Sequence, residues 1–190
     1  MQQWIRKLTL VLAVAGCASV QAGEEPVAMR WDHRPEAAEW TMATRGALGN
    51  HGAALVDMVP EDIDTWCPGY ETAGRAAREL FWTGLFSALA KHESTWDPRA
   101  SGGGGRWIGL LQIAPPTARH YGCMARDAEA LKDGAANLSC GVRIAAVTVA
   151  RDGMVGTGRA GLAADWAPFL SEQKRADMIA WTRAQPYCRK

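Results

Sequence analysis

Apolar residues recur at three- and four-residue spacing along much of the chain, which is the period of a helix that buries one face. The strongest such segment covers residues 71–92, where Phe81, Leu85 and Leu89 follow one another at four-residue steps and lead to Glu93. No alternating pattern of useful length predicts a strand. We therefore predict a mainly α-helical protein.

Other helices are predicted from the residues that begin or break them. Asn137 and Ser171 are expected to cap two of these helices. The expected spans are 35–48, 53–58, 60–67, 115–121, 127–131, 137–150 and 171–184. Residues 97–106, which include four consecutive glycines, and residues 152–159 are expected to be loops.

Residues 1–22 have the pattern of an export leader, with a basic start and an apolar run over 8–15 that is too short to span a bilayer. Two processing sites compete. Val14-Ala15-Gly16-Cys17 resembles a bacterial lipobox, which would remove residues 1–16 and lipidate Cys17. Val20-Gln21-Ala22 resembles a signal-peptidase site, which would release a chain that begins at Gly23. Both predict a periplasmic protein, and the first adds membrane attachment through Cys17.

Cysteine content agrees with export. Both routes remove Cys17 from the folded part, and the remaining Cys67, Cys123, Cys140 and Cys188 suffice for two disulfides in an oxidising compartment. Three pairings exist, and we favour Cys123–Cys140, which closes a local loop, with Cys67–Cys188, which ties down the C-terminal tail. These cysteines lie too far apart for the close pairs of a zinc site.

Charge and motifs exclude several classes of function. The net charge is +1 for the whole chain and −1 without residues 1–22, and no polybasic segment is present, so no nucleic-acid partner is expected. The glycine run is not followed by the Gly-Lys-Ser/Thr of a phosphate loop, and His92-Glu93 lacks the second histidine of a zinc protease. We expect no cofactor and no metal.

Glu93 is the best catalytic candidate, because the apolar face of the predicted helix runs directly into it. A carboxyl group at such a position loses water, its pKa rises, and it stays protonated near neutral pH as a general acid requires. Helix C-termini also disfavour negative charge, so helix formation does not explain a glutamate there.

The residues around Glu93 resemble the catalytic domain of soluble lytic transglycosylases over about residues 78–146. The motif consists of Glu93-Ser94, an aromatic-Asp-Pro at 96–98, Ser101, Gly109-Leu110-Leu111-Gln112-Ile113, Pro115-Pro116-Thr117-Ala118 and the later Asn137 and Gly141. The resemblance implies a lysozyme-like helical domain with long loops around a glycan cleft. It further implies cleavage of peptidoglycan between N-acetylmuramic acid (MurNAc) and N-acetylglucosamine (GlcNAc), with Glu93 as the single acid and base and 1,6-anhydro-muramyl ends as product.

The same resemblance assigns glycan contacts to Ser101 and Gln112, and the Ser94 hydroxyl, next to the acid, could orient the Glu93 carboxyl group or the substrate. Ser94 could equally bond local backbone, and Gln112 could instead hold the loop. Trp96 and Trp107 flank the motif and could stack on sugar rings, or they could be core residues. Family members carry a Tyr-Asn pair after the long helix, whereas this chain reads Ala163-Ala164-Asp165-Trp166, so Trp166 could replace the ring.

We therefore predict a leader, an N-terminal helical extension over 23–70 that packs on the main domain through Trp40 and Trp66, and a catalytic domain over 71–190. Two alternatives stay open. The first is a lysozyme-type hydrolase on the same scaffold, for which Asp97 is the nearest second carboxylate. The second is a catalytically weak peptidoglycan-binding protein of an envelope complex, which the absent Tyr-Asn pair favours.

Overall fold

The computed structural model describes residues 27–190, and the predicted leader with Cys17 lies outside the described residues. Helices dominate, as the sequence predicts. The α-helices are α1 (Ala37–Leu48), α2 (Ala53–Asp57), α3 (Ile63–Trp66), α4 (Arg75–Ser94), α5 (Pro115–His120), α6 (Gly134–Asp152) and α7 (Glu172–Ala184). Short 3-10 helices are η1 (Ala130–Lys132), η2 (Leu162–Ala164), η3 (Ala167–Phe169) and η4 (Pro186–Cys188). Among these residues, no helix is long and apolar enough to cross a membrane.

The two predicted glycine-rich loops contain small hairpins that the sequence pattern did not predict. Strands β1 (Ser101–Gly102) and β2 (Trp107–Ile108) pair antiparallel, as do β3 (Gly156–Thr157) and β4 (Ala160–Gly161). Each strand has two residues, which is too short for an alternating pattern to be visible in the sequence.

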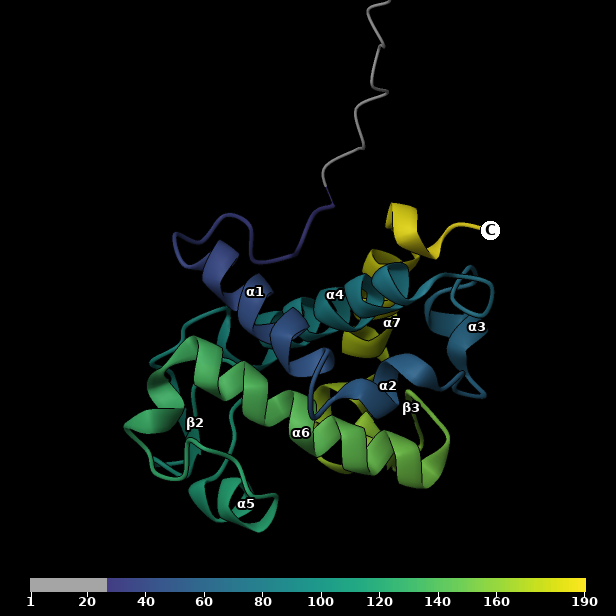
Figure 1. Ribbon diagram of the computed structural model, residues 1–190. Coiled ribbons are helices and arrows are strands. Elements are labelled where there is room, and N and C mark those ends of the chain that lie inside the picture. The colour runs from purple at the N-terminus through teal and green to yellow at the C-terminus, as the bar shows by residue number, and fades with distance from the viewer. Residues whose placement is uncertain (1–26) are drawn as a thin grey trace, which may run out of the picture.

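Helix α4 crosses the centre of the molecule, and α1, α2 and α7 pack against it (Figure 1). Its residues from Phe81 to Ala90 are all buried, so the helix is enclosed on every side and does not present the single apolar stripe that its spacing predicted. Two buried hydroxyl groups donate hydrogen bonds to backbone carbonyls of the same helix. Thr83 donates to the carbonyl of Glu79 at 2.8 Å, and Ser87 donates to that of Gly84 at 2.6 Å.

The N-terminal segment shares one hydrophobic core with the rest of the described chain. Trp40 on α1 and Trp66 on α3 are each about 1% exposed. Trp82 of α4 donates its indole N–H to the carbonyl of Leu55 on α2 at 2.8 Å. The boundary between an extension and a catalytic domain near residue 70 stays a prediction.

Two disulfides close the fold, and they have the favoured pairing. Cys67–Cys188 joins the end of α3 to the C-terminal η4, and Cys123–Cys140 joins the segment after α5 to α6. The predicted cap of α7 is also correct, because the Ser171 hydroxyl accepts from the backbone N–H of Lys174. The predicted cap of α6 is wrong, because the helix begins at Gly134 and Asp133 caps it.

Candidate active site

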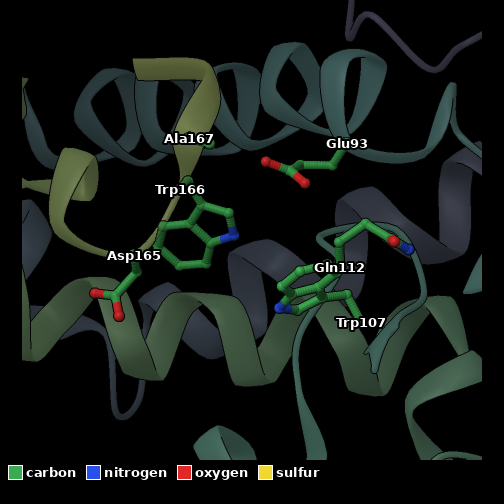
Figure 2. Close-up of a pocket in the computed structure, with 6 residues that line it drawn as sticks. All are labelled: Glu93, Trp107, Gln112, Asp165, Trp166 and Ala167. Carbon is green, nitrogen blue, oxygen red and sulfur yellow. The ribbon is translucent and has the colours of Figure 1, made fainter. Parts of the chain in front are cut away.

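A cavity of about 330 Å³ opens where the end of α4, the β1–β2 hairpin and the segment before η3 meet (Figure 2). Its lining residues are Glu93, Trp107, Gln112, Asp165, Trp166 and Ala167. An adjoining cavity of about 90 Å³ shares four of these residues and extends to Ile113, Ala114, Thr117 and Ile144. Four predicted site residues, Glu93, Gln112, Trp107 and Trp166, therefore surround the same space.

Glu93 lies in the last turn of α4, and its carboxyl group points into this cavity (Figure 2). The helix ends immediately after it, because Thr95 and Trp96 adopt left-handed φ values of 52° and 57°. Burial raises the pKa of the Glu93 carboxyl from 4.5 to about 7, and the positive charge of Lys174 opposes part of that rise. The group is thus protonated to a large extent near neutral pH, as a general acid must be.

The loop Gly109–Ile113 forms another wall of the cavity, and buried side chains hold its backbone. Asn137 of α6 accepts from the N–H of Leu111 at 2.9 Å and donates to the carbonyls of Ile108 and Leu131, also at 2.9 Å. Gly109 has φ +80°, and an added Cβ would come within 2.3 Å of the Asn137 amide. Asn137 therefore lies within α6 and positions the loop. The sequence-based prediction that it caps the helix is wrong.

Gln112 holds the same loop while it lines the cavity. Its backbone is in the left-handed region at φ 48°, and its side-chain nitrogen donates to the carbonyls of Gly109 at 2.9 Å and Ala100 at 3.3 Å. These bonds match the loop-holding alternative, and they leave the carbonyl oxygen of the amide as the group with which Gln112 could meet a ligand.

The two tryptophans of the cavity differ in exposure. Trp107 is 43% exposed at the rim, with the Arg106 guanidinium 5.3 Å from its ring centroid. Trp166 is 4% exposed, and its indole N–H donates to the carbonyl of Leu111 at 3.0 Å. Trp107 can present an aromatic surface to a sugar, whereas Trp166 supports the loop and closes one side of the cavity.

Three predicted site residues do not line the cavity. The Ser94 hydroxyl contacts the carbonyls of Ala90 at 3.2 Å and Leu110 at 3.0 Å, so it bonds backbone. Ser101 is exposed in β1. Trp96 packs its ring edge-on against His33, with centroids 4.5 Å apart, and donates to the carbonyl of Ser87 at 2.9 Å. Glycan contacts by these three side chains stay a prediction.

The site prediction missed two lining residues, Asp165 and Ala167, of which only Asp165 has a titratable side chain. Partial loss of water raises the pKa of its carboxyl group; Arg151 opposes this rise and Asp152 adds to it. In Figure 2 its carboxyl group and that of Glu93 lie on opposite sides of the Trp166 ring. Asp97, the second carboxylate considered from the sequence, is exposed and accepts from the N–H of Arg99 at 2.8 Å, which is the bond of a turn residue.

The described residues contain no group of three or more His, Cys, Asp or Glu side chains that could hold a metal ion. The chemistry that the cavity itself offers is proton transfer at Glu93, next to aromatic and amide groups that can contact a sugar.

The chain is similar to known proteins in part of its sequence and in its fold. Residues 73–151 match the family model of the transglycosylase SLT domain. Among solved structures, Bd0314 DslA in its wild-type form 2 has a TM-score of 0.78 and 26% sequence identity, over 86% of this chain and 98% of that chain. Two glutamate-to-glutamine mutants of that protein have the same TM-score. Their identities are 27% (86% of this chain, 98% of that chain) and 26% (87% and 100%). No curated protein matches the chain.

Proposed function

We propose that this chain, whose residues 73–151 match the family model of the transglycosylase SLT domain, is a lytic transglycosylase that cleaves the MurNAc–GlcNAc bond of peptidoglycan. The family and the mainly helical, lysozyme-like fold support action on peptidoglycan glycan strands. The main support for the mechanism is the environment of Glu93. Its half-buried carboxyl group has a pKa of about 7 and lies in a cavity large enough for part of a glycan.

The proposed reaction needs Glu93 twice. The protonated carboxyl group donates its proton to the oxygen that links MurNAc to GlcNAc, and the bond from that oxygen to the muramyl C1 breaks. The acetamido group of the substrate stabilises the positive charge that develops at C1. The ionised Glu93 then accepts the proton of the muramyl C6 hydroxyl, whose oxygen bonds to C1 and closes the 1,6-anhydro ring. Glu93 gives up one proton and regains one, so it ends the reaction in its starting protonated form, and no water is consumed.

The test is the mass of the soluble fragments released from purified sacculi. A transglycosylase gives muramyl ends that lack one water relative to the hydrolysis product. Glu93→Gln preserves the size of the side chain but removes the transferable proton. General acid–base catalysis typically contributes about a hundred- to ten-thousand-fold, and because Glu93 serves as both acid and base, turnover should fall by the upper end of that range or more. Asp97→Asn is the matched control, because that carboxylate serves a turn and should cost far less. Near wild-type turnover by a folded Glu93→Gln protein would rule out the mechanism.

One observation favours a second candidate, hydrolysis on the same scaffold. Asp165 places a further carboxyl group in the cavity, and glycoside hydrolases commonly use two. In that reaction Asp165 would activate a water molecule while Glu93 donates its proton. Products that retain the elements of water, together with loss of turnover in Asp165→Asn, would select the hydrolase. Anhydro products would select the transglycosylase.

A third candidate is a peptidoglycan-binding protein with weak catalysis. It is favoured by Asp165 and Trp166, which stand where family members carry Tyr-Asn. Wild-type protein that binds sacculi but releases no fragments would select this candidate.

We also propose that the chain is exported through its N-terminal leader and is anchored by a lipid on Cys17. Peptidoglycan lies outside the cytoplasm, and two disulfides fit an oxidising compartment. Cys17→Ala should abolish lipidation and release the protein from the membrane or leave it as an uncleaved precursor. A mature wild-type chain that begins at Gly23 would show that the signal-peptidase site is used instead.

A further inference from the structure

A separate cavity of about 270 Å³ lies between the last turn of α4 and the first turns of α7. It is lined by Lys91, His92, Gln173, Lys174 and Asp177. His92 directly precedes Glu93 in the chain, so this cavity adjoins the end of the helix that carries the proposed acid. None of its lining residues belongs to the Glu93 cavity, and the proposed reaction uses none of them.

The carboxylate of Asp177 is hydrogen-bonded to three neighbouring side chains. Its two oxygens accept from the Arg30 guanidinium at 2.6 and 2.9 Å and from the Lys91 ammonium at 3.2 Å each. The ring of His92 adds a contact of 2.7 Å. These bonds hold the pKa of Asp177 far below its usual range, with the Arg30 contribution largest. The carboxylate is therefore ionised and committed to these partners.

Lys174 is the charged residue of this cavity that does not bond to Asp177. Its side chain is exposed, and no hydrogen bond or ion pair of its ammonium group is found among residues 27–190. Its charge reaches the active site, because it is the charged group that lowers the pKa of Glu93. With Arg30 and Lys91 also present against the single carboxylate of Asp177, the cavity has a surplus of positive charge beside the acid. Glu172, at the start of α7, is exposed and does not line the cavity.

We propose that this cavity is an anion site in which Lys174 binds a carboxylate of the peptide carried by the muramyl residue whose bond lies at Glu93. The inference rests on the proposed function and deepens it by naming stem-bearing glycan as the preferred substrate. The muramyl residue carries its peptide on the sugar next to the broken bond, and peptide carboxylates are negative at neutral pH. A free ammonium group in a positively charged cavity next to Glu93 matches that chemistry.

Binding measurements in the Glu93→Gln background test this without any need for turnover. The probes are uncross-linked glycan strands that carry their peptides and the same strands after an amidase has removed the peptides and the lactyl carboxylate left by this hydrolysis has been converted to a methylamide. The measured quantity is the ratio of the two dissociation constants. Lys174→Met should reduce the preference for stem-bearing strands about fivefold, as for a partly exposed ion pair, and Lys174→Glu should reduce it further. The preference should also weaken as salt is raised.

Lys132→Met is the matched control, because that lysine lies on η1 and pairs with the exposed Glu129 at 2.6 Å. It should leave the ratio unchanged. Equal affinity of the starting protein for both strands, or an unchanged ratio in both Lys174 variants, would overturn the anion site. Stem-selective binding that depends on Lys174 in a protein that releases no fragments would keep the anion site and refute the proposed cleavage. The two failures are therefore distinguishable.

Discussion

The raised pKa of Glu93 predicts that the proposed acid destabilises the folded protein at alkaline pH. Burial favours its protonated form, with a pKa of about 7 in the folded state against a usual value of 4.5. As pH rises from 4.5 through 7, the unfolded chain loses this proton before the folded one does. The free energy of unfolding should therefore fall over that window, and Glu93→Gln, which cannot ionise, should escape the fall.

The size of the effect follows from the two pKa values. A rise from 4.5 to about 7 corresponds to about 3 kcal/mol between the two protonation states. Because the cavity is open to water, we expect Glu93→Gln to gain about 1–3 kcal/mol over wild type at pH 8. Below pH 4.5 the carboxyl group is protonated in both states, so this gain should disappear.

Urea denaturation of both proteins at several pH values from 4 to 8.5 measures the difference directly. Glu71→Gln provides a control, because Glu71 is exposed in the turn before α4 and its removal should cause no comparable pH-dependent gain. A difference between wild type and Glu93→Gln that does not change with pH would refute the reasoning. So would a Glu93→Gln protein that is less stable than wild type at pH 8.

Three further predictions concern other parts of the molecule. Because Glu93 must be protonated to donate, kcat/KM on glycan strands should decline above about pH 7, and a profile flat to pH 9 would contradict its role as the acid. Replacing both cysteines of a disulfide by serine should lower the free energy of unfolding by an amount that grows with the length of the closed loop. We expect a loss of about 5 kcal/mol for Cys67–Cys188, which spans 121 residues, and about 3 kcal/mol for Cys123–Cys140, which spans 17. Thermal unfolding of the two variants would show whether this order holds. Asp177→Asn should cost about 1–2 kcal/mol at pH 7. Because the folded-state pKa of Asp177 is depressed, its contribution exists above the usual value of 3.8 and is lost as pH falls below it, so equal losses at pH 7 and pH 3 in urea titrations would argue against an ionic contact.

The sequence predicts the helices well where the physical cause is local. Apolar spacing locates α4, Pro115 and Pro116 begin α5, and Ser171 caps α7. The start of α6 was misplaced because Asp and Asn are equally good caps, and the choice between Asp133 and Asn137 depends on distant contacts. Helix α6 begins at Gly134 because the Asp133 side chain caps it, and Gly134 packs closely on the Trp40 indole, where an added Cβ would lie 2.3 Å from the ring nitrogen.

The site residues nearest to Glu93 in the chain were predicted from one motif, whereas Trp166 was predicted only from its place after the long helix. Glu93 and Gln112 belong to one motif, and the structure brings both to the cavity. Asp165 lies more than 70 positions beyond Glu93, in a region where the sequence departs from the family, so its place beside the cavity follows only from the path of the chain after α6. The signal available was the absent Tyr-Asn pair, which pointed to this segment but not to the carboxyl group within it.

The spacing between Glu93-Ser94 and the Gly109–Ile113 loop has a structural reason, because the loop backbone is bonded from three separate elements. The Ser94 hydroxyl of α4 donates to the carbonyl of Leu110, and Asn137 of α6 accepts from the N–H of Leu111. Trp166 donates to the carbonyl of the same Leu111. A buried loop requires such partners for its backbone, and these partners also fix the loop relative to the end of α4. Trp166 thus helps to hold the cavity wall that faces Glu93, which gives this departure from the family pattern a structural role whatever it contributes to glycan binding.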